Sequence, residues 1–222
     1  MELTATDSDR FEAMRHAMVA SQLRTNAVND ARVVAAMARV PREAFLPEAA
    51  RGLAYRDTAV PLAHGRSQNL PIATGRLLTE AYLQPADRVL LIGAAGGYTA
   101  AVLAELVFEV VAVECEPGLA ELARQALSAY PNVSLVEGPL EAGHAAGAPY
   151  DVLMIDGAVE HVPEALVAQI RIGGRAVAGI ADRGVSRLAS GRRTAGGFAL
   201  LDFADIDCVS LPGFARPRSF TF

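Results

Sequence analysis

A glycine-rich turn followed by an acidic residue is the pattern in this sequence that points most directly to chemistry. The apolar run RVLLIG, residues 88–93, leads into Gly96 and Gly97 and then into a helical pattern. Small residues let a ligand approach the backbone, and a helix N-terminus offers free N–H groups. Glu114 follows Gly93 by 21 residues, at the end of the next apolar run. A carboxylate there can accept both hydroxyls of an adenosine ribose, so the pattern predicts a nucleoside-containing cofactor.

Two cofactors compete for such a site. NAD needs room for its pyrophosphate along the glycine turn, and Gly93, Gly96 and Gly97 do not form a strict G-x-G-x-x-G. S-adenosylmethionine (SAM) has no phosphate and places a sulfonium there. A long helical segment before the first strand and two strand candidates close together near the C-terminus favour SAM, because an NAD domain more often starts at its first strand.

Alternating strands and helices are expected to hold these residues in place. Apolar runs predict strands over 88–93, 107–114, 133–138, 150–157 and 175–181, with helices over 96–106, 117–130 and 162–170. Two further strand candidates cover 196–204 and 208–213. The alternation predicts an α/β fold, a doubly wound Rossmann-like sheet that is mostly parallel, with an antiparallel strand near the C-terminus.

The segment before the sheet is predicted to be largely helical. Residues 8–40 show helical spacing of apolar residues, with Asn29 and Asp30 available as a cap for the second helix, and 75–83 returns to a helix. Residues 62–71, LAHGRSQNLP, have no periodicity and predict a polar loop. We expect one domain over 1–222, in which 1–84 supply helices and a loop and 85–222 form the cofactor-binding sheet.

The composition excludes several classes of function. The chain has 20 arginines and no lysine, which excludes Schiff-base chemistry and the lysine-dependent P-loop and kinase sites. The net charge of −5 and the scattered arginines argue against a nucleic-acid partner. The two cysteines and four histidines show no metal-ligand spacing, so no metal is expected. The longest uncharged run, 89–104, is short for a membrane span, and the polar first ten residues are unlike a signal peptide. A cytoplasmic protein is expected, whereas the oligomeric state is left open.

Several motifs resemble those of one enzyme family. The segment VPREAFLPEAARGLAYRDTAVPLAHG, residues 40–65, is similar almost residue by residue to the linking segment of the protein-L-isoaspartate O-methyltransferases. Met18-Val19 and Gln22-Leu23 resemble the opening helix motif of that family. VLLIGAAGGYTAAVLA and VVAVE resemble its glycine motif and its acidic strand end, and YDVLMIDGAVEHVPEALVAQIRIGGRAV resembles its fourth strand, the next helix and the fifth strand. The segment 40–65 is specific to the family, whereas many methyltransferases share the glycine motif.

The resemblance implies a fold, a cofactor and a reaction. It implies a seven-stranded methyltransferase sheet preceded by N-terminal helices, with SAM as the cofactor and isoaspartyl-containing proteins or peptides as the partner. Such enzymes methylate the α-carboxylate of isoaspartyl residues, and the ester then closes to a succinimide that reopens partly to aspartate. A carboxylate is already ionised at neutral pH, so catalysis consists mainly of alignment. The resemblance places the cofactor against Gly93, Ala94, Ala95, Gly97, Glu114, Cys115, Gly138, Pro139 and Asp156.

The acceptor loop departs from the family pattern. Where the family reads close to GQTISQP, this chain has GRSQNLP, residues 65–71. Ser67 then falls on the family's Thr, and Asn69 falls on the Ser that holds the substrate carboxylate. Arg66 replaces a Gln and could clamp a carboxylate with two N–H groups. Arg66, Ser67 and Asn69 are therefore the candidate catalytic residues, although an ordinary polar surface loop would give the same pattern.

The cofactor motifs have changed as well. Leu91 stands where the family usually has an acidic residue, Ala95 where it has glycine, and Pro139 where it has an aspartate that contacts the adenine. Asp156 replaces a Thr and could supply the acidic group lost at Leu91. We expect these changes to weaken cofactor binding. Two alternatives thus stay open beside the repair enzyme: a SAM-dependent enzyme with another acceptor, and a non-catalytic SAM-binding or interaction protein.

Overall fold

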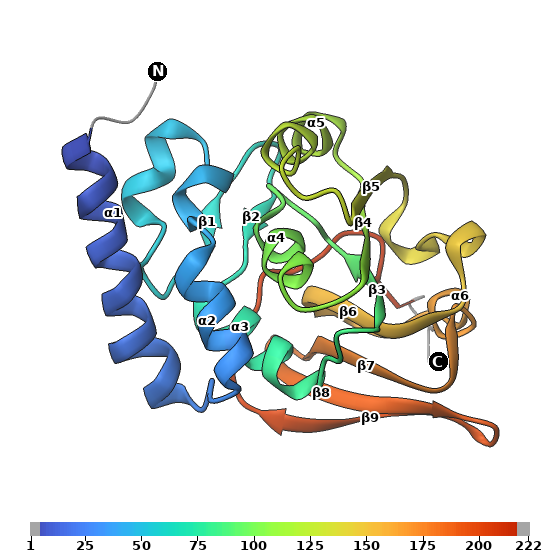
Figure 1. Cartoon of the computed structure of the whole chain (residues 1–222). Helices are drawn as coiled ribbons and strands as arrows, with labels where there is room; N and C mark the ends of the chain where they lie inside the picture. Colours follow the sequence, from blue (N-terminus) through green and yellow to red (C-terminus); the bar gives the residue numbers. More distant parts are fainter. Residues whose placement is uncertain (1–4, 217–222) are drawn as a thin grey trace.

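The predicted strands form one seven-stranded sheet. In the computed structural model, which describes residues 5–216, the strand order is β5-β4-β3-β6-β7-β8-β9 (Figure 1). Strands β3 to β7 are parallel, and β8 is antiparallel to both of its neighbours. Their bounds are β3 Arg88–Ile92, β4 Glu109–Glu114, β5 Val133–Glu137, β6 Tyr150–Val159, β7 Ile170–Asp182, β8 Val185–Thr194 and β9 Gly197–Ala204. The expected fold class, with its antiparallel strand near the C-terminus, is confirmed.

Each parallel strand is apolar throughout because both faces of the sheet are covered. Val89 and Leu91 of β3 face one core cluster, and Leu90 and Ile92 face the other. The first cluster includes residues from the five helices α1 to α5, and the second includes α6 and the C-terminal segment around Leu211. The helices are α1 Ala5–Met18, α2 Ala31–Arg39, α3 Pro71–Glu80, α4 Tyr98–Ala104, α5 Pro117–Ala126 and α6 Glu164–Val167, with a π-helical turn Val19–Leu23 after α1.

Local sequence explains where two of these helices begin. Asp30 caps α2: its carboxylate accepts the N–H groups of Arg32 at 2.8 Å and Val33 at 3.4 Å, as the sequence predicts. Pro117 opens α5 at the first helical position, where its missing N–H has no consequence.

Several expectations about elements were wrong. Strand β8 was not predicted, because its exposed arginines hide any alternation of apolar residues. Residues 208–213, predicted as a strand, form only one isolated bridge, from Ser210 to Ala158. The helix predicted over 162–170 is only α6, four residues long, because Ile170 already belongs to β7. Helix α3 begins at Pro71 rather than at residue 75, since proline is well placed at a first helical position.

The segment predicted as a polar loop, 62–71, is part of a hairpin with an exposed tip at His64 and Gly65 and a second strand that packs inside the protein. Strand β1 (Val60–Pro61), just before this segment, pairs antiparallel with β2 (Ser67–Gln68) inside it. Arg66, Gln68 and Asn69 are all buried. Polar side chains in such a position need partners inside the protein, and these partners define the site described below.

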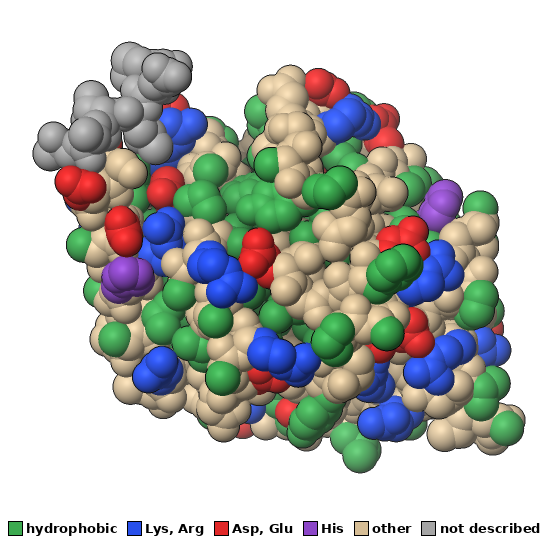
Figure 2. Space-filling model, in the orientation of Figure 1, with side chains coloured by type: hydrophobic (Ala, Val, Ile, Leu, Met, Phe, Trp, Pro, Cys, Tyr) green, Lys and Arg blue, Asp and Glu red, His purple; other side chains and the backbone are tan. Residues whose placement is uncertain are grey.

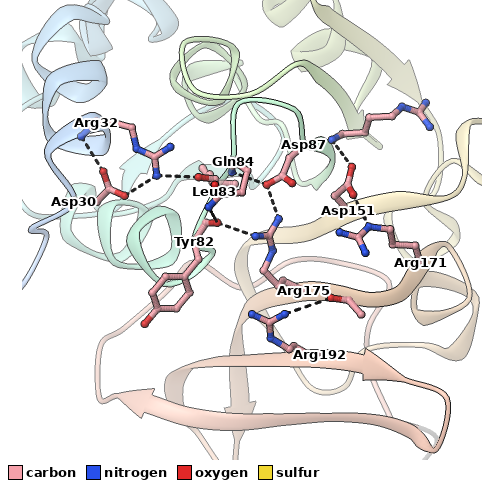
Figure 3. Close-up of polar contacts among 12 residues, drawn as sticks. Asp30, Arg32, Tyr82, Leu83, Gln84, Asp87, Asp151, Arg171, Arg175 and Arg192 are labelled. Atoms are coloured by element: carbon pink, nitrogen blue, oxygen red, sulfur yellow. Dashed lines mark hydrogen bonds and ion pairs between the residues drawn. The ribbon is translucent and has the colours of Figure 1, made fainter.

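The amino ends of the strands are tied together by a polar network (Figure 3). Arg175 of β7 contacts the Asp87 carboxylate at 2.5 Å and donates to the Tyr82 carbonyl at 2.8 Å. Asp151 of β6 contacts Arg171 at 2.5 Å and accepts the N–H of Arg88 at 2.8 Å. The network joins the turn before β3 to β6 and β7 at the edge of the sheet opposite to the glycine turn.

Charges of both signs are interspersed on the face of the molecule shown in Figure 2, in keeping with the scattered arginines of the sequence. Within residues 5–216, no helix is both long and apolar enough to cross a membrane. Of the polar first ten residues, which are unlike a signal peptide, residues 1–4 lie outside the described part of the chain.

Candidate functional site

The predicted cofactor residues gather at the carboxyl ends of four neighbouring strands. Ile92 of β3 is in register with Val113 of β4 and Ile155 of β6. The next residues along these strands, Gly93, Glu114 and Asp156, therefore lie side by side. Gly138 follows β5 and donates its N–H to the Glu114 carbonyl at 3.0 Å. Ligands of doubly wound sheets bind at this edge, where the strand order reverses.

The glycine turn has the backbone that its sequence predicts. Gly93 and Gly97 have φ of +84° and +98°, a region that favours glycine. Ala95 also has a positive φ, +49°, so it occupies a conformation that an alanine adopts at a cost. Gly96 has another role: a Cβ there would run into the carbonyl oxygen of Phe45, so this glycine serves packing.

Glu114 is fully buried and saturated with donors. Its Oε1 accepts the N–H groups of Cys115 at 3.0 Å and Glu116 at 3.1 Å, and its Oε2 accepts that of Ala95 at 2.7 Å. Arg66 adds two more donors, Nε to Oε1 at 3.3 Å and Nη2 to Oε2 at 3.0 Å. Burial alone would raise the pKa of Glu114, but the Arg66 guanidinium and the backbone N–H groups outweigh it and lower this pKa below its usual value.

Arg66 reaches this carboxylate from the β1–β2 hairpin. Its side chain is only 6% exposed, and its Nη1 is buried without a hydrogen-bond partner among the described residues. His64, two residues before Arg66, has an exposed side chain whose Nε2 lies 3.6 Å from Glu116 Oε1. The hairpin therefore contacts the end of β4 at two points, the buried ion pair of Arg66 with Glu114 and the exposed contact of His64 with Glu116.

Asp156 lies at the centre of a second polar cluster. It accepts hydrogen bonds from Asn69 Nδ2 at 2.9 Å, Thr74 Oγ1 at 2.9 Å and Thr99 Oγ1 at 2.5 Å. Leu91 is in register with Met154, two residues before Asp156, so Leu91 and Asp156 face the same side of the sheet. Asp156 thus puts an acidic group one strand away from the position where the family pattern has one.

Asn69 connects β6 to the C-terminal segment through hydrogen bonds of its side chain. Its Nδ2 contacts Asp156, and its Oδ1 accepts the N–H groups of Leu70 at 3.0 Å and Val209 at 3.3 Å. Both ends of its amide are thus engaged. Ser67 is half-buried, and its hydroxyl has no hydrogen-bond partner among the described residues.

Arg42 and Leu211 belong to this site, but the sequence did not predict them. Arg42 is completely buried, donates to the Asn69 carbonyl and lies 4.7 Å from the centre of the Tyr98 ring. Burial lowers the pKa of Arg42, partly offset by Tyr98 and Asp156. Leu211 packs against the glycine turn: a Cβ on Gly93 would stand 3.0 Å from its Cδ1. The only hint of Arg42 in the sequence is its place in the family-like segment 40–65. Nothing else in the sequence distinguishes this buried arginine from the other arginines of the chain.

The remaining predicted residues lie close to Glu114 but differ in what they offer. Ala94 donates its N–H to the Val113 carbonyl at 3.0 Å, and Cys115 Sγ lies 3.6 Å from Glu114 Oε1. No atom outside its chain neighbours lies within 4 Å of where a Cβ on Gly138 would be. Pro139 comes next and opens a short 3₁₀ turn.

Comparison with known proteins identifies the family. The model of the protein-L-isoaspartate(D-aspartate) O-methyltransferase family matches residues 14–210. The chain belongs to this family. It is 41% identical over 191 residues to protein-L-isoaspartate O-methyltransferase 1 of Rhodopseudomonas palustris (strain HaA2), covering 85% of this chain and 78% of that protein. It is 40% identical over 205 residues to the protein-L-isoaspartate O-methyltransferase of Methylorubrum extorquens (strain PA1), covering 91% and 90%.

Solved structures support the fold. A protein-L-isoaspartate O-methyltransferase structure superposes with a TM-score of 0.79 at 23% identity, covering 90% of this chain and 66% of that one. A Plasmodium falciparum structure, described as a complex of such an enzyme with S-adenosyl-L-homocysteine, has a TM-score of 0.72 at 17% identity, covering 90% and 97%. Membership of the methyltransferase family confirms the expectations of an enzyme and of SAM as its cofactor.

The strand ends fit this cofactor under one condition. The positive φ angles at Gly93 and Gly97, the carboxylate of Glu114 and the open space at Gly138 suit an adenosine group lying across β3, β4 and β5. The condition is that the Arg66 guanidinium leaves Glu114, because both oxygens of that carboxylate are engaged.

Proposed function

We propose that this protein is a SAM-dependent methyltransferase that transfers a methyl group to the carboxylate of isoaspartyl residues in damaged proteins. The observation that carries the proposal is the row formed by Gly93, Glu114 and Asp156 at the carboxyl edge of the sheet, in a chain of this family. Glu114 and the glycine turn would hold the cofactor, together with Ala94, Ala95, Cys115, Gly138 and Pro139 around them.

When bound, SAM supplies an electrophilic methyl group on its sulfonium. The acceptor carboxylate is ionised at neutral pH, so no side chain of this chain needs to remove a proton. The residues of the site have to align and desolvate the acceptor. Arg66 is the candidate that would bind the acceptor carboxylate. Asn69 would act as a positioning residue, since its amide already joins Asp156 to the C-terminal segment.

The enzyme would work as one domain over 1–222. Residues from α1 to α5 and from β3, β4, β6, β7 and β8 belong to one core cluster, which joins the segment 1–84 to the sheet. A cytoplasmic location stays a prediction, which cell fractionation would test.

A methyl-transfer assay tests the proposal. Purified protein, labelled SAM and an isoaspartyl peptide should yield labelled methyl ester, whereas the matched aspartyl peptide should yield none. The variant Glu114→Gln should bind SAM more weakly, because an amide accepts from a ribose hydroxyl at one atom only. SAM binding without any methylation of isoaspartyl peptides would contradict the repair function.

One observation favours a second candidate, a SAM-dependent enzyme with another acceptor. Asn69, which replaces the family's carboxylate-holding Ser, is fully engaged by Asp156, Leu70 and Val209. Methylation of other carboxylates in a substrate panel, with the isoaspartyl peptide inert, would support it. Calorimetry that detects no heat with millimolar SAM would instead favour an interaction protein and contradict both enzyme functions.

A further inference from the structure

The Arg66 guanidinium presents to Glu114 the same pattern of donors that a ribose would present. Its Nε and Nη2 each donate to one of the two carboxylate oxygens, at 3.3 Å and 3.0 Å. Two vicinal ribose hydroxyls would donate to the same two oxygens. Arginine and ribose are therefore alternative partners of this carboxylate.

Both partners cannot be accommodated together. Five N–H groups already converge on Glu114, three from the backbone of Ala95, Cys115 and Glu116 and two from Arg66, although a carboxylate has only about four lone-pair sites. Two ribose hydroxyls can therefore be accepted only in exchange for two of the present donors, not in addition to them. The backbone donors are fixed by the fold, so only Arg66 can give way.

We propose that Arg66 has two positions in the catalytic cycle: on Glu114 before the cofactor binds, and on the acceptor carboxylate afterwards. The proposal rests on the proposed function, because it takes the acceptor to be a carboxylate. In the first position Arg66 competes with the cofactor. In the second it binds the acceptor. The cofactor then binds first and the acceptor second.

The surroundings of Arg66 supply the reason for the second position. Its Nη1 is buried without a partner, and both amide atoms of the neighbouring Gln68 are also buried and unpaired among the described residues. A guanidinium that left Glu114 but stayed buried would be an unpaired charge inside the protein, which is strongly unfavourable. Its planar fork of donors matches a carboxylate best. An acceptor carboxylate would restore the pairing that the ribose removes.

The release leaves Glu114 supported. Ala95, Cys115 and Glu116 still donate three N–H groups to it when Arg66 is absent. Removing Arg66 by mutation should therefore spare the turn. Glutamine is the suitable replacement, because the family's loop usually carries it there.

Calorimetry with S-adenosyl-L-homocysteine tests the first position. Wild type, Arg66→Gln and the control Arg192→Gln are compared; Arg192 is exposed and lies at the amino-end edge of the sheet (Figure 3). The affinity should rise about tenfold or more in Arg66→Gln and stay unchanged in Arg192→Gln, while Arg66→Lys, which keeps the charge without the fork, should fall between. Unchanged or weaker binding by Arg66→Gln, in a sample that is folded at the temperature of the measurement, would overturn the proposal. If Arg66→Gln folds poorly, Arg66→Lys decides by the same criterion.

Peptide titrations test the second position. Wild type should bind an isoaspartyl peptide tightly only when saturated with S-adenosyl-L-homocysteine. By linkage the peptide should raise the affinity for S-adenosyl-L-homocysteine by the same factor. In Arg66→Gln this coupling should vanish, and KM for the peptide should rise more than kcat falls. Equal peptide affinity with and without S-adenosyl-L-homocysteine in the wild type would overturn the proposal.

The two proposals fail in different ways. If wild type methylates no isoaspartyl peptide although Arg66→Gln binds S-adenosyl-L-homocysteine more tightly, the acceptor assignment fails and with it the second position of Arg66. If the peptide is methylated but Arg66→Gln changes neither affinity nor coupling, the proposed function stands and the two-position role of Arg66 is wrong.

Discussion

The glycines of the turn do different work although the sequence shows them as one motif. Gly93 and Gly97 are needed for their positive φ. Gly96 is needed because the carbonyl oxygen of Phe45 occupies the place of a side chain. The turn is thus locked to the segment before the hairpin by a backbone contact that has no connection with the cofactor.

Gly96→Ala should therefore destabilise the protein. A Cβ would collide with the Phe45 backbone, which cannot yield as a side-chain end can, so we expect a loss of about 2 kcal/mol or more in unfolding free energy. The melting temperature should fall by roughly 4 °C or more. Thermal unfolding followed by circular dichroism measures it. Gly52→Ala is the matched control, because no atom outside its chain neighbours lies within 4 Å of its Cβ position. Equal melting temperatures of the two variants would contradict the packing role of Gly96.

At the scale of elements, two segments meet over the ends of β3 and β6. The β1–β2 hairpin brings Arg66 and leads into Asn69, and the C-terminal segment brings Cys208, Val209 and Leu211. Asn69 joins them through the Val209 N–H, and the segment pairs with β6, with Ala158 donating to the Val209 carbonyl at 2.7 Å. Access to the site therefore depends on both segments together.

The reactivity of Cys208 should report on this closure. Burial and the nearby Asp156 raise the pKa of the Cys208 thiol to about 12, whereas Cys115, at the end of β4, has a smaller rise that is also due first to burial. Iodoacetamide reacts with thiolates, so at about pH 8 it should modify Cys115 much faster than Cys208. Mass spectrometry of Cys115→Ser and Cys208→Ser variants separates the two rates, and denaturant should equalise them. Equally fast modification in the folded protein would show that the C-terminal segment does not keep Cys208 shielded against Asn69 and Asp156.

Elements with local patterns could be predicted, whereas contacts between distant segments could not. The buried parallel strands show as continuous apolar runs, and the Asp30 cap shows as a residue type at a helix start. Strand β8 is held by pairing with β7 and β9, so its own residues carry little signal. Glu114 could be predicted because it follows Gly93 by 21 residues, at the end of the next strand along the chain. Its contact with Arg66, 48 residues away in the chain, depends on how the hairpin packs and has no sequence signature.

At the scale of the whole molecule, the two edges of the sheet are specialised. The carboxyl edge carries the site, and the amino edge carries the network of Figure 3, in which Arg175 contacts the Asp87 carboxylate with both side chains mostly buried. Arg175→Ala leaves Asp87 buried without its cation, so it should cost about 3 kcal/mol in unfolding free energy. Urea unfolding measures the cost.

The affinity for S-adenosyl-L-homocysteine should stay unchanged in Arg175→Ala if the edges are independent. Arg192→Ala is the matched control, because Arg192 is exposed and its contact with the Gly173 carbonyl is long, 3.4 Å; its effect should stay within about 0.5 kcal/mol. A loss of cofactor affinity in Arg175→Ala at temperatures well below its melting point would show that the network also shapes the site.

Acid should weaken the whole molecule through carboxylates that are held in their charged form. The pKa of Glu114 is lowered in the folded protein because Arg66 and backbone N–H groups outweigh its burial, and the pKa of Asp151 is lowered by the Arg88 N–H and Arg171 against the same opposing effect. A group with a lowered folded pKa contributes stability above its unfolded pKa, and this stability is lost as the pH falls through the folded pKa. The unfolding free energy should thus decline below about pH 4.

The share of this decline that belongs to Arg66 can be isolated. In Arg66→Gln the pKa of Glu114 should move upward, because its strongest favourable partner is gone while its burial remains. The wild type should be the more stable protein at about pH 6, and its advantage should shrink as the pH falls through the lowered folded pKa of Glu114, because a protonated Glu114 no longer pairs with the Arg66 charge. Urea unfolding across this range, without cofactor, gives the difference directly. A difference that stays constant with pH would mean that the two groups are not coupled as charges, and the competition between Arg66 and the ribose for Glu114 would lose its electrostatic basis.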